Sequence, residues 1–507
     1  MEARENHGAS KYIIIGGGIA GVSCAEMLAD VSPDDSVLLL TASSLIKSVT
    51  NYKKIGKTLE EFDVEEKAVS SINTQCANVR AIHTAVSAIS AAQHEVYTDQ
   101  GVFSYEKLCI CTGGVPKLLA PQNPHVIGIR DTESVKELQN RLANAQRILV
   151  VGNGGIATEI VYEIEGCDII WAVKDDSITS TFVDCGAAQF FLPQLKNDKS
   201  TESGGPMKRL KYTTAETPGV SSSTKGSHGG ALGPDWHSGI DMKGQTKKSH
   251  NIHVEYKVEV KAIYTAEEMR ESGKTADVVP NLTEHSDLLK SPGGDKTLLN
   301  HSWAVYAELT NGKIYGCDFI ISATGVTPCP PTCLDENQLE LASDGGVKVD
   351  DNMRTNLTNI YAAGDICTAS WKPSKHWHQM RLWSQARQMG AYAAQCMTAH
   401  SKGEEMTLDF CFEMFAHSTK FFNYKVILLG CFNAQGLGSD HELLIRVTEG
   451  KEYVKAVMQD GRMMGAILIG ETDLEETFEN LILNGMDLSS YGEDLLDPNV
   501  DIEDYFD

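Results

Sequence analysis

Two glycine-rich stretches contain the residues that could do chemistry in this chain. The first follows an apolar run over residues 11–15, which predicts a buried strand of a parallel sheet. Gly16, Gly18 and Gly21 come next at GxGxxG spacing, and a helical pattern begins at Val22. Gly16 permits a tight turn, Gly18 lets the backbone approach a pyrophosphate, and Gly21 lets the helix pack closely on the strand. Because a helix N-terminus presents free N–H groups and a partial positive charge, this stretch predicts a dinucleotide site.

The second stretch repeats that order in the middle of the chain. An apolar strand over residues 147–151 leads into residues 152–157, which have the spacing GxGxxA and precede an expected helix. A strand over 169–173 then ends at Lys174, and two aspartates follow. NAD enzymes tend to have an acid at this point and NADP enzymes a base, so the choice between NADH and NADPH stays open. Two such turns predict that the chain binds two dinucleotides.

Two connecting segments also share a pattern. Residues 107–117, KLCICTGGVPK, and residues 319–328, FIISATGVTP, are each an apolar strand that ends in Thr-Gly and reaches a proline. The crossover positions are Thr112-Gly113 and Thr324-Gly325. A pattern that recurs in one chain predicts two nucleotide-binding units built alike.

The segment after the second strand of the first unit departs from the usual pattern. An acidic residue that binds a ribose is typical about 20 positions after the last glycine, but this position is Thr41. Residues 43–63 predict a polar-faced helix, on which Lys47 could stabilise negative charge on a bound flavin or lie on a solvated face. No cysteine occurs between Cys24 and Cys76, so a redox thiol pair beside a flavin is not expected.

A third set of candidate residues lies near the end of the nucleotide-binding region. Residues 359–365, NIYAAGD, predict an apolar strand after which Asp365 can bond a ribityl or pyrophosphate-side hydroxyl. A helix is expected to begin near residues 381–383, where its dipole would stabilise the anion of a reduced flavin. His376 and His378 could instead donate protons at the flavin edge, or simply pack.

The composition is that of a globular protein in a reducing compartment. The chain has 507 residues, enough for three domains, and no apolar run of the ~18 residues that a membrane span needs. Its N-terminus has no apolar segment typical of a secretory signal. Its 13 cysteines are scattered and form no zinc pattern, so no metal site is expected. The net charge of −25 argues against a nucleic-acid or anionic-membrane surface.

The C-terminal part predicts a separate domain. Strands are expected at residues 425–429, 442–447, 453–458 and 463–469, and a helix over 473–483. Asp460-Gly461 is the favoured two-residue hairpin turn. Residues 196–250 are rich in Ser, Thr, Gly and Lys and predict a flexible insertion. Residues 486–507 form an acidic tail with interleaved apolar side chains.

The order of these motifs resembles that of the pyridine nucleotide-disulfide oxidoreductases, flavoproteins that bind two dinucleotides. Besides the glycine turns and crossovers, the resemblance rests on YEIEGC, LGPDWH, IYGCDFI, YAAGDICT, QMRLW, HSTKFFNYKV and the final SSYGEDLLDPNVDIEDYFD. It implies an α/β fold with two Rossmann-like domains and a C-terminal α+β domain. The expected bounds are an FAD domain over 1–125 and 318–402, an NAD(P)H domain over 126–317, the C-terminal domain over 403–485 and the tail.

The resemblance also implies which residues contact each cofactor. FAD is expected at Gly16, Gly17, Gly18, Ile19, Ala20, Gly21, Thr41, Thr112, Gly113, Asp365, Arg381 and Leu382. NAD(P)H is expected at Gly152, Asn153, Gly154, Gly155, Ile156, Ala157, Lys174, Thr324 and Gly325. Lys47 is the candidate catalytic side chain.

The expected activity is that of an FAD-dependent NAD(P)H oxidoreductase, which passes a hydride from NAD(P)H to FAD and then electrons to dioxygen or a small acceptor. Two alternatives stay open: a thiol/disulfide reductase that uses Cys24, Cys111 or Cys367, and a redox-gated binding protein with negligible turnover. The resemblance implies a partner, the oxidation-sensitive catalytic subunit of the tRNA ligase complex, which the tail 486–507 would bind and NAD(P)H-dependent binding would protect. Residence in cytoplasm and nucleus is then expected, with no nucleic acid or membrane as a direct partner.

Overall fold

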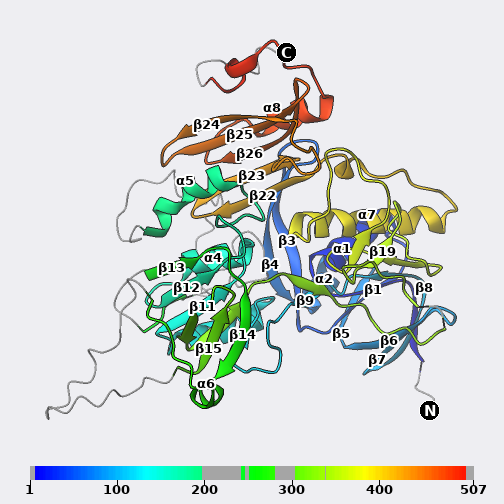
Figure 1. The fold of residues 1–507 in the computed structure, drawn as a ribbon. Helices are drawn as coiled ribbons and strands as arrows, with labels where there is room; N and C mark the ends of the chain where they lie inside the picture. The colour runs from blue at the N-terminus through cyan, green and yellow to red at the C-terminus, as the bar shows by residue number, and fades with distance from the viewer. Residues whose placement is uncertain (1–5, 197–240, 246–250, 280–302, 337, 498–507) are drawn as a thin grey trace, which may run out of the picture.

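Three packed units make up the protein. The computed structural model describes residues 6–196, 241–245, 251–279, 303–336 and 338–497 (Figure 1). The predicted fold class is confirmed, because two Rossmann-like sheets are followed by a third, antiparallel sheet. Most of the predicted insertion over 196–250 and the last part of the predicted tail, 498–507, lie outside the described residues.

The first unit is a sheet in the order β5-β2-β1-β8-β7-β6, with β20 paired to β8. Its strands are β1 (Asn6–Ile15), β2 (Val37–Thr41), β5 (Val79–His83), β6 (Val86–Ser90), β7 (Glu95–Thr98), β8 (Gly101–Ile110) and β20 (Ile360–Ala362). Its helices are α1 (Ile19–Val31), α2 (Ser70–Gln75) and α7 (Trp383–Ser401). α1 packs along α7, and the two approach so closely that a Cβ on Gly390 would overlap the backbone of Ala20. β1, β2, β5, β8 and β20 run parallel, which brings their carboxyl ends to one edge.

The second unit is a parallel sheet in the order β10-β17-β11-β12-β13. Its strands are β10 (Val126–Ile127), β11 (Arg147–Val151), β12 (Asp168–Ala172), β13 (Asn251–Glu255) and β17 (Phe319–Ser322), with the helices α3 (Thr132–Leu142), α4 (Gly155–Glu163) and α5 (Cys185–Lys196). A small antiparallel sheet adds β14 (Val260–Thr265), β15 (Val305–Leu309) and β16 (Ile314–Cys317), beside α6 (Ala266–Ser272). β17 pairs with β10 and β11, so the second unit extends to Ser322 and the boundary expected at 317/318 is wrong.

The two units are joined by short paired connections. β9 (Gly114–Pro116) pairs with β18 (Val326–Pro328), and these strands contain the two prolines of the recurring pattern. A further small pair, β19 (Val347–Val349) and β21 (Cys367–Ala369), lies beside β20 in the first unit.

The third unit is an antiparallel sheet in the order β22-β23-β26-β25-β24. Its elements are β22 (Ala416–Phe421), β23 (Tyr424–Gly430), β24 (Glu442–Thr448), β25 (Glu452–Gln459), β26 (Arg462–Ile469), α8 (Glu475–Asn484) and the short helices η2 (Phe410–Phe412) and η3 (Gly492–Leu496). Asp460 and Gly461 both have positive φ, as the predicted hairpin turn requires. The helix expected from residue 473 begins at Glu475, because Asp473 has a φ of 54°. One face of this sheet shares a hydrophobic core with the second unit.

The polar helix expected over residues 43–63 is wrong. The chain there forms an antiparallel hairpin of β3 (Leu45–Lys54) and β4 (Glu60–Ala68). β3 alternates between buried and half-buried side chains over its first half, which is the period of a strand. Lys47, Lys53 and Lys54 each face a glutamate across the hairpin. These opposite-charge pairs across the two strands stabilise the hairpin.

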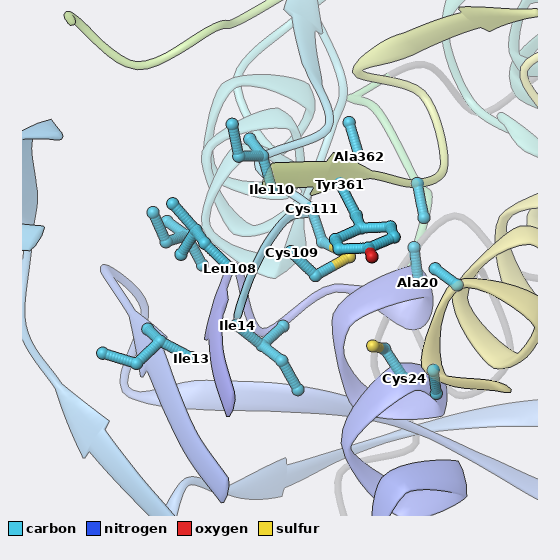
Figure 2. Close-up of a cluster of buried hydrophobic side chains, with 14 of the residues drawn as sticks. Ile13, Ile14, Ala20, Cys24, Leu108, Cys109, Ile110, Cys111, Tyr361 and Ala362 are labelled. Carbon is cyan, nitrogen blue, oxygen red and sulfur yellow. The ribbon is translucent and has the colours of Figure 1, made fainter. Parts of the chain in front are cut away.

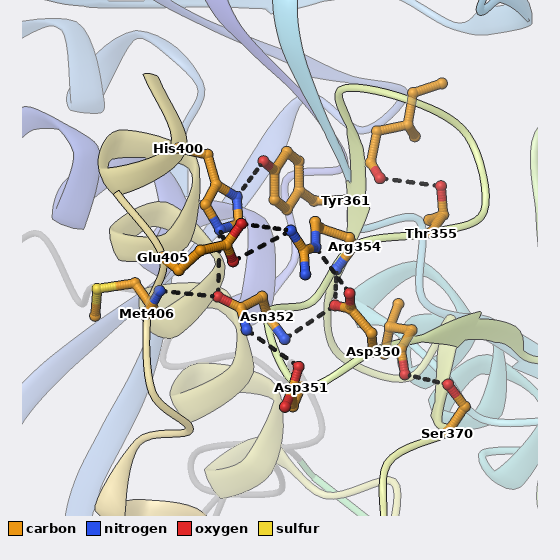
Figure 3. A network of polar contacts seen from close by, with 12 residues as sticks. Asp350, Asp351, Asn352, Arg354, Thr355, Tyr361, Ser370, His400, Glu405 and Met406 are labelled. Atoms are coloured by element: carbon orange, nitrogen blue, oxygen red, sulfur yellow. Dashed lines mark hydrogen bonds and ion pairs between the residues drawn. The ribbon is translucent and has the colours of Figure 1, made fainter. Parts of the chain in front are cut away.

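A polar network holds the C-terminal end of α7 (Figure 3). His400, in the last turn, lies 2.6 Å from the Tyr361 hydroxyl through Nδ1 and 3.2 Å from Asn352 Oδ1 through Nε2. Arg354 joins the network through Asp350 at 2.8 Å and Glu405 at 3.3 Å. With this end fixed to the loops around β20, the orientation of α7 is set, and so is the place of its N-terminus.

Candidate active site

The first glycine turn has the geometry that a pyrophosphate needs. Gly16 has a φ of 120°, and a Cβ there would overlap the carbonyl of Cys111, which directly follows β8. A Cβ on Gly21 would overlap the Gly16 carbonyl, so this glycine lets α1 pack against the turn. Gly18 has open space where a Cβ would lie, and no side chain caps the helix that begins after it. The first N–H groups of α1 are therefore available to an anion.

The first glycine of the second turn makes the same close approach to a backbone carbonyl as the first glycine of the first turn. Gly152 has a φ of 135°, and a Cβ there would overlap the carbonyl of Ala323, which directly follows β17. Gly154 faces open space and is the N-cap residue of α4, which no side chain caps. Ala157 is fully buried, as the third small position of GxGxxA requires. Each turn thus presents a bare helix N-terminus at the end of a parallel sheet.

A cluster of charged side chains lies beside the first turn. The Lys47 N–H donates to the Gly17 carbonyl at 2.9 Å, and this places Lys47 at the turn although it lies on a strand. Burial lowers the pKa of Lys47, although the negative charges of Asp365 and other nearby acids raise it in part. Burial raises the pKa of Asp365, although the positive charges of Arg381, Lys47 and Arg130 lower it in part. These groups come from four separate parts of the chain and share one half-buried region.

Arg130 was missed by the sequence analysis. Its guanidinium donates to the Thr112 carbonyl at 3.4 Å and lies near both Lys47 and Asp365. It precedes α3 in an irregular stretch and belongs to no motif, so no pattern in the sequence identified it.

The start of α7 is close to where the sequence predicted it. Leu382 is the N-cap residue and its side chain makes no capping bond, so the first N–H groups of this helix are also free. Arg381 Nε donates to the Asp365 carbonyl at 2.8 Å, and its Nη2 bonds Asp344 at 2.8 Å. Arg381 therefore joins the helix start to the loop that follows β20.

The remaining expected cofactor contacts lie either against the first glycine turn or at the two crossovers. Thr41 is 3% exposed, and its Oγ1 lies 2.6 Å from where a Cβ on Gly17 would be, so it supports the turn from below. The hydroxyls of Thr112 and Thr324 bond carbonyls across the crossovers, Thr112 to Cys329 and Thr324 to Lys117, both at 2.8 Å. Among these positions, Gly113 and Gly325 leave open space where a Cβ would be.

The far end of the second site lies around the carboxyl ends of β12 and β13. Lys174 is exposed, whereas Asp175 accepts hydrogen bonds from Asn153 Nδ2 at 2.8 Å and from Ser180. A cavity of about 270 Å³ is lined by Asp176, Ser177, Ile178, Cys185, Ala188, Gln189, Leu192 and Tyr256. The side chain of Asn153, an expected ligand, is therefore committed to the loop that leads to this cavity.

Several thiols lie beneath the first turn rather than in it (Figure 2). Cys24, Cys111 and Cys367 are all buried, and the sulfurs of Cys109 and Cys111 are 3.6 Å apart. The pKa of Cys111 is raised by a hydrogen bond with Cys109 and by burial. The pKa of Cys367 is raised by burial. Because the thiolate is the reactive form, these positions are poor nucleophiles.

The two candidate proton donors pack against the third unit. His378 stacks on Phe415 with ring centroids 4.3 Å apart, and burial lowers its pKa to about 4. His376 Nδ1 lies 3.3 Å from the Met464 carbonyl, and burial lowers its pKa as well. Both rings are therefore neutral near pH 7, which favours the packing alternative.

The described part of the chain has neither a cluster of metal ligands nor a membrane-spanning helix. No group of three or more His, Cys, Asp or Glu side chains there could hold a metal ion. None of the helices in that part is long and apolar enough to cross a membrane.

Comparisons with known proteins agree with this architecture. Residues 10–174 and 293–390 match the family described as pyridine nucleotide-disulphide oxidoreductase, and residues 416–486 match the rubredoxin NAD⁺ reductase C-terminal domain. The mouse "Pyridine nucleotide-disulfide oxidoreductase domain-containing protein 1" is 56% identical over 502 residues, covering 98% of this chain and 99% of its own. The Dictyostelium discoideum protein of the same name is 39% identical over 557 residues, covering 98% and 100%.

Solved structures show the same fold at low identity. A ferredoxin reductase from Rhodopseudomonas palustris has a TM-score of 0.61 at 14% identity, covering 98% of this chain and 99% of its own. An NAD-dependent persulfide reductase from A. fulgidus has a TM-score of 0.61 at 16% identity, covering 95% and 78%. With its two-part family match and relatives along its whole length, the chain belongs to the pyridine nucleotide-disulfide oxidoreductase family.

Proposed function

We propose that the protein is an FAD-dependent NAD(P)H oxidoreductase that works without a thiol relay. The observation that carries this proposal is the duplicated turn: Gly18 and Gly154 both face open space at an uncapped helix N-terminus. The first turn has Lys47, Asp365 and the start of α7 beside it, which suits a flavin, and the second belongs to the smaller unit. FAD is therefore assigned to the first turn and NAD(P)H to the second.

When bound, FAD would supply the chemistry by accepting a hydride from the nicotinamide. The protein would hold both pyrophosphates at helix N-termini and orient the two rings. Lys47 and the free N–H groups at the start of α7 would stabilise negative charge on the reduced ring. Asp365 would accept hydrogen bonds from hydroxyls of the flavin side chain. The electrons would leave to dioxygen or a small diffusible acceptor.

The thiol reductase alternative has less support. Cys24, Cys111 and Cys367 are buried, and the pKa values of Cys111 and Cys367 are raised. A reductase needs a thiolate that its substrate can reach. Replacing each of the three cysteines with serine is expected to leave NADH oxidation unchanged; loss of turnover in one of these variants would revive the alternative.

The expected partner and location stay proposals. The segment 486–507 contains eight acidic residues and no basic one, so it suits a basic groove or a partner's bound metal ions. We propose, on the resemblance, that it binds the catalytic subunit of the tRNA ligase complex and protects it from oxidation when NAD(P)H is present, in cytoplasm and nucleus. Leu488, Leu495 and Leu496 of this segment are buried in the core of the third unit. Deleting residues 498–507, which leaves these three in place, should abolish NADH-dependent co-purification with that subunit. Unchanged binding would contradict this role of the tail.

Spectra of the purified full-length protein test the activity. One FAD per chain is expected, and NADH added without oxygen should bleach the flavin absorbance. Reoxidation within seconds of admitting air supports an oxidase. A reduced spectrum or a long-wavelength band that persists in air favours the redox-gated binding protein. A protein that neither retains nor rebinds flavin contradicts the proposal.

A further inference from the structure

A buried histidine lies against the helix start that the proposed function assigns to FAD. His417 belongs to β22 and is 1% exposed. Its Nδ1 lies 3.0 Å from the hydroxyl of Ser384, in the first turn of α7. Its ring centroid is 4.7 Å from that of Trp383, the first residue of the same helix. The third unit thus places an imidazole at the N-terminus of α7.

The same imidazole is close to the helix start assigned to NAD(P)H. Phe182 has its ring centroid 6.4 Å from that of His417. The Phe182 ring also comes within 3.4 Å of where a Cβ on Gly155, the first residue of α4, would be. Phe182 therefore contacts both His417 and the second glycine turn. A nicotinamide that extends from that turn toward the flavin would pass through this region.

The second nitrogen of His417 has no partner in the part of the chain that the structure describes. Buried polar atoms without a hydrogen bond are rare and destabilise a protein, so such an atom points to a missing ligand or water. Burial lowers the pKa of His417 to about 3, and the ring is therefore neutral near pH 7. A neutral imidazole has one nitrogen that donates and one that accepts.

We propose that Nε2 of His417 binds the carboxamide of the nicotinamide when NAD(P)H occupies the second site, an inference that rests on the proposed function. A carboxamide matches either tautomer of the ring. If Ser384 donates to Nδ1, then Nε2–H donates to the carboxamide oxygen; if Nδ1–H donates to Ser384, then Nε2 accepts from the amide. This contact requires the Phe182 ring, which lies between His417 and Gly155, to turn aside and admit the group. His417 is then a residue that positions the nicotinamide against the flavin.

Binding of NAD⁺ and of ADP-ribose to the flavin-loaded full-length protein tests this contact. ADP-ribose has the adenosine, the pyrophosphate and the second ribose, but no nicotinamide. His417→Leu is expected to weaken NAD⁺ binding about tenfold, which is about 1.4 kcal/mol, and to leave ADP-ribose binding unchanged. His417→Gln, which keeps one donor and one acceptor, should restore most of the NAD⁺ affinity. Isothermal titration calorimetry gives both dissociation constants.

Ser384→Ala provides a second variant in case His417→Leu loses its flavin. It frees the imidazole to rotate, so NAD⁺ binding should weaken about threefold with ADP-ribose binding unchanged. Equal losses for the two ligands, or no loss for NAD⁺ in both variants, would overturn the role of His417. A wild-type holoprotein that binds neither ligand would instead contradict the proposed function itself.

Discussion

The two glycine turns have the same backbone conformation but are held in place by different side chains. Gly16 and Gly152 have φ values of 120° and 135°, and a Cβ on either would overlap the carbonyl that follows the neighbouring strand. At the next position, Gly17 packs on the buried Thr41, whereas Asn153 bonds the segment after β12. The shared backbone is what a pyrophosphate requires. The side chains that hold each turn in place differ between the two units. Substituting them should therefore impair one cofactor site without the other.

Gly16→Ala is expected to have the largest effect. The new methyl group would overlap the Cys111 carbonyl at a φ that disfavours alanine, so the loss of stability should be about 4 kcal/mol or more. Thermal unfolding of the purified protein, or its failure to express in soluble form, measures this loss.

Gly18→Ala is the matched control for that variant. Its Cβ would lie in open space at a φ of −76°, so the melting temperature of the flavin-free protein should stay within a few degrees of that of the wild type. Its methyl group would block the pyrophosphate, and flavin content should fall sharply. If Gly18→Ala kept full flavin content, the assignment of FAD to the first turn would be wrong.

The first site also depends on the third unit through Glu479. This fully buried carboxylate of α8 accepts hydrogen bonds from the N–H groups of Lys57, Thr58 and Leu59, at the turn of the hairpin that contains Lys47. Glu479→Ala would leave these donors without a partner and should lower the free energy of unfolding by about 3 kcal/mol. Urea denaturation measures this free energy of unfolding. The control Glu476→Ala, at an exposed position on the same helix, should change the free energy of unfolding by under about 0.5 kcal/mol.

The second unit is tied to the third by the Asp184–Lys455 ion pair, in which Lys455 is 2% exposed. Burial raises the pKa of Asp184, but the Lys455 ammonium and the N–H groups of Gly186 and Ala187 together lower it to below its ordinary value. The carboxylate therefore stabilises the protein above the unfolded pKa of about 4, and this stability is lost as the pH falls through the folded pKa. Asp184→Asn should cost about 3 kcal/mol at pH 7 and progressively less as the pH falls below about 4. A cost independent of pH would contradict this account.

Apart from the two control variants, Asn153→Ala is expected to have the smallest effect on stability. It removes the bonds to Asp175, Ser177 and Ser180 and frees the second turn, at a cost of about 2 kcal/mol. NADH affinity should weaken while flavin content stays near one per chain, as fluorescence titration and absorbance can show. Loss of flavin together with NADH affinity would mean that the two turns are not independent.

The glycine turns could be predicted because their requirement is local. Backbone conformation and close approach at Gly16, Gly21 and Gly152 exclude any side chain, so the residue type itself reports the geometry. The start of α7 was also predicted near residues 381–383, and the helix begins at Trp383.

The parts that could not be predicted depend on contacts between distant segments. The β3–β4 hairpin reads as a polar helix because its charged residues pair across two strands instead of along one element. Arg130 belongs to no motif, and the motif HSTKFFNYKV, which begins at His417, indicated no role for that histidine; only the packing of separate units brings the two residues to the site. The sequence of a single segment contains no pattern that predicts contacts with distant segments.

An anaerobic titration of the flavin-loaded protein with NADH tests the central claim most directly. The account predicts that one equivalent of NADH per flavin bleaches the visible absorbance of the bound flavin, and that Gly154→Ala requires a large excess. A flavin spectrum that stays unchanged at saturating NADH would contradict the claim that the two turns deliver a nicotinamide to a flavin.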